Sequence, residues 1–392
     1  MLRKIIKSNI YLEYFIKNTI MINNVSRNNL ILNISRRSEL NDYIESPEID
    51  KLRELVFELR SIGRKKNELL RLNNIDSESL LYGHIDSLIN YSKCISLCKV
   101  EYPFIEHGID FEEEEVNVIN TMIFQGAYKR SKVSNIRLPF FTIGPYIHYS
   151  KNLFDTEKMN KLKKEYGKTL LYFPSHSMET FNIEYDVREN IEYITNNYSD
   201  NYDTFIVCMY WNDIANEVDK LYKKYGFKVV TAGLRSDRNF LDRLKTIILL
   251  SDTVLLNDLT TALGYSIFLK KPVVIRAHEI KKNFMRNDGD DLNPCDGQYN
   301  DTLNIALKLF NNKNKITEEQ LVFVEKYWGL SNIKSEDEIK FILELNAKII
   351  KYSLGFRFLY SAVVFIKTKF WCKGSDRMMD NKLKLLLESL NR

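Results

Sequence analysis

Cysteine is scarce in this sequence, and its spacing excludes two common ways of stabilising a fold. The chain has five cysteines, and no two of them form a Cys-x-x-Cys pair. An odd number argues against a complete disulfide framework, and the missing spacing argues against a structural zinc site. We therefore expect a protein of a reducing compartment. The cysteines are Cys94, Cys98, Cys208, Cys295 and Cys372.

Long apolar runs are also missing. No segment approaches the roughly 18 consecutive apolar residues of a membrane-spanning helix. The first residues, MLRKIIKSNIYLEYFIKNTIMINN, are interrupted by lysine and glutamate and lack the apolar centre of a signal peptide. We expect a cytoplasmic protein that is peripheral on the inner face of the cell membrane if part of it binds lipid.

Neither sign of charge is in large excess. The 57 Lys and Arg residues stand against 52 Asp and Glu residues, which gives a net charge of +5. So small an excess gives no reason to expect a nucleic-acid partner.

Hydrophobic residues make up 44% of the chain, which is normal for a globular protein, and 392 residues suffice for two domains.

The second half of the sequence alternates short apolar runs with helical stretches, one of which, DIANEVDKLYKKYG, predicts a single helix. This alternation predicts an α/β fold with a parallel sheet covered on both faces. Before it, IRLPFFTIGPYIHYS is the predicted hinge, because it carries two prolines and a glycine. The predicted strands are Thr169–Phe173, Thr204–Met209, Phe227–Thr231, Thr253–Leu256 and Pro272–Ile275.

Polar loops follow these predicted strands, and ligands of such sheets bind beyond the carboxyl ends of the strands. In the loop NDLTT, Asn257 makes the turn, and Thr260 and Thr261 can cap and begin a helix. A helix N-terminus favours an anion, and Gly264 permits close approach of a ligand or the sheet. An ordinary capped helix is the alternative. Neither G-x-G-x-x-G nor G-x-x-x-x-G-K-[ST] is present, so a dinucleotide site and a P-loop are not expected.

The run SDTVLLNDLTTALGYSIFLKKPVVI resembles the donor-side segment of two-domain, GT-B-type glycosyltransferases, especially those of bacterial capsule and lipopolysaccharide assembly. The stretch IEHGIDF resembles their N-domain HG loop, and TIGPYIHY resembles their interdomain linker. Lys270 stands where these proteins often have glycine. The resemblance covers roughly residues 80–335. It implies two Rossmann-like domains facing a cleft, in which a sugar passes from a nucleotide sugar to a growing surface polysaccharide or lipooligosaccharide.

This resemblance gives the domains their expected roles. We expect an acceptor-side domain that is first helix-rich and then Rossmann-like, a Rossmann-like donor domain, and a helical tail. The tail includes YSLGFRFLYSAVVFIKTKFWCKG, whose apolar and cationic residues suit either an anionic membrane surface or packing across the domains. The three parts cover residues 1–148, 149–335 and 336–392.

On the donor side, the loop PSHS supplies Ser175, His176 and Ser177, which can hydrogen-bond a donor phosphate or the leaving group. A positively polarised His176 would stabilise the charge that develops on that phosphate. Arg235 can pair with a donor phosphate, and a solvated loop is the alternative. The resemblance places Glu279 where related enzymes bind ribose. His148 and His278 are interpreted as structural.

On the acceptor side, Glu106 and His107 follow a predicted strand, where either can act as the general base for the acceptor hydroxyl. His84 and Asp86 form a second candidate pair. Polar residues that cap a strand and a turn are the alternative for both pairs.

No metal or other cofactor is expected. The carboxylates of the segment Asp288-Gly289-Asp290 can hold Mg²⁺, but an exposed acidic loop explains them better. The expected partners are a nucleotide-sugar donor, CMP-linked acidic sugars included, and a glycan or glycolipid acceptor. Two other functions stay open: a CDP-polyol phosphotransferase of teichoic-acid-like synthesis, and a non-catalytic scaffold of the same fold.

Overall fold

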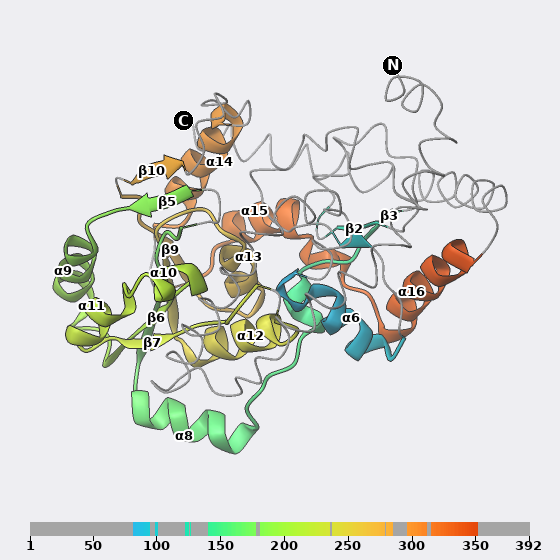
Figure 1. Ribbon diagram of the computed structural model, residues 1–392, viewed down its shortest axis with the longest axis horizontal. Helices are drawn as coiled ribbons and strands as arrows, with labels where there is room; N and C mark the ends of the chain where they lie inside the picture. The colour runs from blue at the N-terminus through green and yellow to red at the C-terminus, as the bar shows by residue number, and fades with distance from the viewer. Residues whose placement is uncertain are drawn as a thin grey trace, which may run out of the picture. The chain divides into compact units, whose positions relative to one another are not determined.

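The structure is a computed structural model of the whole chain (Figure 1), and it divides into two compact units. The first unit contains the described residues up to Tyr149 and from Val322 onward. The second contains the described residues from Ser150 to Leu321. The structure describes residues 81–94, 99–100, 122–124, 126, 140–177, 181–235, 237–278, 280–284, 296–311 and 315–351.

The second unit is built on a five-stranded parallel sheet with the order β7-β6-β4-β8-β9. The chain starts in the middle at β4, moves outward through β6 to β7, and then returns to β8 on the other side of β4. Because the direction of winding reverses there, β4 and β8 flank the topological switch point of the sheet. The strands are β4 (Thr169–Phe173), β6 (Thr204–Cys208), β7 (Lys228–Val230), β8 (Thr253–Leu256) and β9 (Val273–Ile275).

The composition of these strands explains their place in the sheet. All four residues of β8 and all three of β9 are buried. Parallel strands are covered on both faces, so they consist of nearly continuous apolar runs and do not alternate apolar with polar residues. The strand predictions for this half of the chain are therefore confirmed, with differences of one residue at some ends.

Two helices of the second unit, α8 and α9, begin at an aspartate that caps them. Asp155 caps α8 by accepting from the amide of Lys158 at 2.8 Å. Asp186 caps α9 by accepting from the amides of the second and third residues after it. The helices are α8 (Thr156–Tyr166), α9 (Val187–Tyr198), α10 (Trp211–Ala215), α11 (Asp219–Lys224), α12 (Phe240–Leu250), α13 (Thr261–Phe268) and α14 (Asp296–Leu309).

The prediction of one helix over DIANEVDKLYKKYG is wrong. Two short helices, α10 and α11, stand in its place, and Glu217 between them has a φ of 65°. A left-handed residue cannot continue a right-handed helix, so the backbone turns there although the side chains favour a helix. The break leaves α10 as a single compact turn directly after β6.

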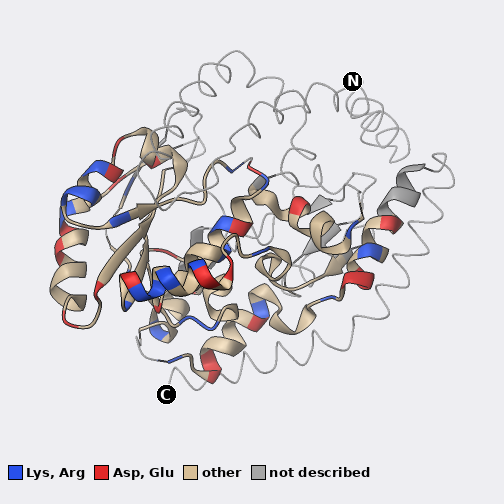
Figure 2. Cartoon of the chain, turned by 90° about the horizontal axis from the view of Figure 1, so that it is seen from below, with Lys and Arg blue, Asp and Glu red and all other residues tan. Residues whose placement is uncertain are grey.

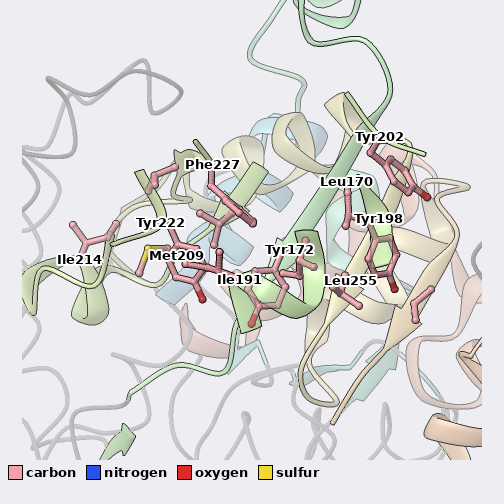
Figure 3. Close-up of a cluster of buried hydrophobic side chains, with 14 of the residues drawn as sticks. Leu170, Tyr172, Ile191, Tyr198, Tyr202, Met209, Ile214, Tyr222, Phe227 and Leu255 are labelled. Carbon is pink, nitrogen blue, oxygen red and sulfur yellow. The ribbon is translucent and has the colours of Figure 1, made fainter. Parts of the chain in front are cut away.

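The core of the second unit is rich in tyrosine (Figure 3). Tyr172 of β4, Tyr198 of α9 and Tyr222 of α11 are all almost fully buried. The rings of Tyr172 and Tyr222 lie 6.1 Å apart, and the Tyr222 hydroxyl lies 3.4 Å from that of Tyr185. The core therefore rests mainly on the packing of these aromatic rings, with one contact between phenol hydroxyls at its edge.

The first unit contains a three-stranded parallel sheet with the order β1-β2-β3. Parallel pairing is what a Rossmann-like domain requires, but these strands have only two or three residues each. A second Rossmann-like domain therefore stays a prediction. The described elements are η1 (Leu81–Gly83), α6 (His84–Ser92), β1 (Lys99–Val100), β2 (Met122–Phe124), β3 (Phe140–Thr142), η2 (Tyr146–Tyr149), η3 (Leu330–Asn332) and α16 (Glu336–Lys351), with α15 (Glu318–Trp328) shared between the units.

The stretch predicted as a hinge ends at the boundary between the two units, which falls between Tyr149 and Ser150. It contains β3 and η2, and the hydroxyl of Tyr149 accepts from the amide of Lys334 at 2.9 Å. Lys93 at the end of α6 pairs with Glu336 of α16 at 3.2 Å. Within the described residues, no helix combines the length and apolar content needed to cross a membrane.

Charged residues of both signs are distributed over several of the described helices (Figure 2). One ion pair of the second unit is buried: Arg243 lies 2.9 Å from Asp237, and both side chains are 2% exposed. Arg243 also donates to the carbonyl of Ala232 at 3.3 Å. The pair therefore fixes the loop after β7.

We expect Arg243→Met to lower the free energy of unfolding by about 3–5 kcal/mol, because Asp237 loses its buried ion partner. Urea unfolding measures the change. Adding Asp237→Asn to the same chain should recover much of the loss. The exposed pair of Lys220 and Glu217 is the control, since Lys220→Ala should cost less than about 1 kcal/mol. Equal losses for Arg243→Met and Lys220→Ala would show that burial of the Arg243 pair adds nothing to stability.

Candidate functional site

The candidate site lies at the carboxyl ends of β4 and β8, where two polar loops leave adjacent strands. Phe173 and Leu256 pair at the ends of these strands, and the amide of Asn257 donates to the carbonyl of Phe173 at 3.3 Å. The loop 174–177 (the β4 loop) and the loop 257–260 (the β8 loop) therefore start side by side. This is the switch point of the sheet, which is where open α/β sheets bind their ligands.

In the β4 loop, two serines have different surroundings. The hydroxyl of Ser175 is buried and has no hydrogen-bond partner among the described residues. The hydroxyl of Ser177 accepts from the amide of Ile183 at 3.1 Å, and the amide of Ser177 lies 3.3 Å from each carboxylate oxygen of Asp213. Ser175 is therefore available to a ligand, whereas Ser177 is engaged by the protein.

His176 stands between these serines, and its ring stacks on Tyr210 with the centroids 4.4 Å apart and the planes at 25°. Burial lowers the pKa of His176, while the carboxylate of Asp258 acts in the opposite direction. The ring is therefore neutral at physiological pH, not the positively polarised group that the sequence suggested. A neutral imidazole can donate one hydrogen bond and accept another.

The N-terminus of α13 opens from the β8 loop. Thr260 is the N-cap residue, yet its hydroxyl makes no capping bond, is buried and has no partner among the described residues. No acidic side chain lies in the first turn of α13, and the dipole of the helix favours an anion there. Thr261 begins the helix and is half-buried, and Gly264 is buried within it.

His278, interpreted from the sequence as structural, adjoins Asn257. The Asn257 side-chain amide donates to the carbonyl of Arg276 at 3.3 Å and lies against Nδ1 of His278. Nε2 of His278 and Oδ1 of Asn257 are buried and have no partner among the described residues. The ring of His278 meets Tyr185 edge-on at 5.1 Å, and burial lowers its pKa. In the sequence, only its position directly after the strand β9 indicated that His278 could belong to the site.

Arg276 is fixed by the start of α9. Its guanidinium donates to Asn190 at 2.5 Å, pairs with Glu189 at 3.1 Å and stacks on Tyr193 at 3.7 Å. These contacts hold the end of β9 and with it the backbone beside Asn257, because the amide of Arg276 donates to the carbonyl of Leu256. Arg276 therefore positions the site through its backbone.

A two-stranded antiparallel ribbon continues from this edge of the sheet. β5 (Phe181–Glu184) follows the β4 loop, and β10 (Lys281–Phe284) follows His278. Because β5 is tied to Ser177 through Ile183, the ribbon and the β4 loop are held together.

Asp213 in α10 is a further titratable residue beside the β4 loop. It is 7% exposed, and burial raises its pKa from 3.8 to about 6. The contacts from Ser177 act in the opposite direction. Strongly shifted carboxylates concentrate at functional sites.

The remaining predicted residues lie apart from this cluster or outside the described residues. Arg235 follows β7, which is separated from β4 by β6. His84 and Asp86 are buried in α6 of the first unit, and burial lowers the pKa of His84 to about 3. Glu106, His107 and Glu279 are outside the described residues, as are the segment 288–290 and the tail segment 352–374.

Among the described residues, no three His, Cys, Asp or Glu side chains gather in a way that would hold a metal ion. The cofactor expectation is not tested by this observation.

The strand order and the polar switch point define the second unit as a Rossmann-type α/β domain. A solved structure described as "Structure of the Wall Teichoic Acid Polymerase TagF" is similar to this chain at 16% identity and a TM-score of 0.35. The match covers 61% of this chain and 59% of that one, so this chain spans about three fifths of that protein's length. At this TM-score the likeness does not define the fold. No protein-family model and no curated protein matches the chain.

We expect Asp213→Asn to raise the free energy of unfolding by about 1–3 kcal/mol at about pH 7.5. Because the folded pKa of Asp213 is raised, its contribution to stability is fully present below about pH 4 and is lost as the pH rises through about 6. The neutral amide avoids this loss. Urea unfolding at a series of pH values tests it, and the difference between variant and wild type should vanish near pH 4. A constant difference at every pH would show that the ionisation of Asp213 is not the cause.

Proposed function

We propose that the chain is a glycosyltransferase that moves a hexosyl or other glycosyl group from a nucleotide sugar to a growing surface polysaccharide or lipooligosaccharide. One observation carries the proposal: two adjacent loops at the switch point of a parallel sheet place buried, unpartnered hydroxyls beside the open N-terminus of α13. Buried hydroxyls without partners at the positive end of a helix dipole suit the phosphate of an activated donor. The resemblance of residues 251–275 to glycosyltransferase donor segments agrees with this use.

In the proposed donor complex, the hydroxyls of Ser175 and Thr260 donate to phosphate oxygens, together with the first amides of α13. Oδ1 of Asn257 and Nε2 of His278 bind hydroxyl or amino groups of the donor. Thr261 belongs to the first turn of the same helix. We assign Ser177 a positioning role, because Ile183 and Asp213 already engage it. Arg235 and Glu279 remain proposed contacts to the donor.

The reaction breaks the bond between the anomeric carbon and the phosphate oxygen, and the electron pair goes to that oxygen. A hydrogen bond from neutral His176 and the dipole of α13 would stabilise the charge that develops there. The acceptor oxygen forms the new bond to the anomeric carbon, and its proton passes to a general base. We propose Glu106 or His107 for that role.

His84 is a poor candidate for the general base, although it lies on the proposed acceptor side. With a pKa of about 3, its imidazole binds a proton only weakly, whereas a base works best when its pKa is near the working pH. His84 and Asp86 are more consistent with a structural role at the start of α6.

A location at the inner face of the membrane remains part of the proposal.

The test is a donor panel read by mass spectrometry, which includes CMP-, UDP- and GDP-sugars and CDP-polyols, with nucleotide binding measured by calorimetry. We expect transfer from, or hydrolysis of, one class of nucleotide sugar. Phosphate retained in the product would instead indicate a polyol phosphotransferase. No nucleotide binding and no turnover across the panel would refute both, and would leave a scaffold.

Two substitutions connect the activity to the site. His176→Asn should lower kcat by about 10²–10³-fold, because it removes stabilisation of the leaving group. Thr260→Val should weaken nucleotide binding about tenfold without unfolding α13, because the hydroxyl makes no capping bond. Thr204→Val, at the amino end of β6, is the matched control and should leave nucleotide affinity unchanged. If Thr204→Val weakens binding as much as Thr260→Val, the effect is not local to the site.

A further inference from the structure

Two consecutive residues of the β4 loop are held by the first turn of α10 and its N-cap residue. The ring of His176 stacks on Tyr210, and the amide of Ser177 lies 3.3 Å from both oxygens of Asp213. Tyr210 and Asp213 are joined as well, since the amide of Asp213 donates to the carbonyl of Tyr210 at 3.1 Å. This turn therefore fixes the β4 loop through a ring and a carboxylate at neighbouring positions.

Ser177 connects Asp213 of α10 to Ile183 of β5. Its hydroxyl accepts from the amide of Ile183 at 3.1 Å, and its own amide points to the carboxylate of Asp213. A carboxylate that accepts from the amide of Ser177 restrains the backbone of this residue, and the bond to Ile183 passes that restraint on to β5.

The buried carboxylate of Asp213 lacks a compensating cation among the described residues. The other titratable groups that face it are Tyr185 of the β5 side and Tyr222 of α11. Burial raises the pKa of both phenols, that of Tyr222 to about 12, so both are neutral at physiological pH. A buried carboxylate without a cation lowers stability and persists where function depends on it.

We propose that Asp213 is a positioning residue, whose carboxylate fixes Ser177 and thereby holds the ring of His176 against Tyr210. Its effect on catalysis rests on the proposed function, whereas its effect on the loop exists without any substrate. When the carboxylate is protonated, its bonds to Ser177 lose their charge-assisted strength and the loop opens more often. The sequence distance of 36 residues between Ser177 and Asp213 is bridged only in the folded unit.

Hydrogen–deuterium exchange at the amides of Ser177 and Ile183 tests the effect on the loop. At about pH 7.5, Asp213→Asn should exchange about fivefold faster than wild type after correction for the intrinsic rate, because a neutral amide is a weaker acceptor. At about pH 5, the two proteins should exchange alike, since Asp213 is then mostly protonated.

Asp242→Asn is the matched control for this experiment. Asp242 is also a buried carboxyl of the second unit with a raised pKa, but it accepts from the amide of Lys151 at 2.8 Å, not from the β4 loop. It should leave exchange at Ser177 and Ile183 unchanged. Equal exchange of wild type and Asp213→Asn at both pH values, or the same acceleration by Asp242→Asn, overturns the proposal.

Steady-state kinetics provide a second, separate test of the role of Asp213. With the nucleotide sugar of the panel that wild type uses, Asp213→Asn should lower kcat about tenfold at unchanged KM and should remove the acid limb of the kcat profile near pH 6. Asp242→Asn should keep that limb. A raised KM at unchanged kcat would overturn the link to His176. If no donor of the panel is used, the proposed function fails, while the exchange result still decides the role of Asp213 in the loop.

Discussion

The pairing of β4 with β8 is the constraint on which the candidate site depends. These strands are buried and apolar, so water exclusion and a parallel ladder bring them together whatever the sequence of the loops after them. Once they are paired, the β4 loop and the β8 loop start side by side. The apolar strands thereby bring the polar side chains of Ser175, His176 and Thr260 to one edge of the sheet.

Some loops around the site are held by satisfied contacts, whereas others keep buried polar groups whose missing partners lower stability. Arg276 and the buried pair of Asp237 and Arg243 fix the loops after β9 and β7 through satisfied contacts. The β4 loop and the β8 loop instead keep the buried hydroxyls of Ser175 and Thr260 without partners among the described residues, and Nε2 of His278 after β9 is in the same situation. Such groups lower the stability of the free protein, and a ligand with complementary donors and acceptors would recover that loss.

Much of the second unit could be predicted from the sequence because its signals are local. Thr253–Leu256 is an apolar run between Asp252 and Asn257, so the strand and the polar loop after it were both visible. The roles of Asp213 and His278 were not, because they depend on burial and on neighbours distant in sequence. The break at Glu217 was missed because a backbone φ of 65° has no simple signature in side-chain pattern.

The separation of the two loops along the chain has a consequence for biosynthesis. The hydrogen bond between Phe173 and Asn257 joins segments that are separated along the chain by β6 and β7. Contacts between distant segments form late in folding and, during translation, only after the later segment has been made. A nascent chain that still holds β8 inside the ribosome therefore lacks the pairing that brings the two loops together.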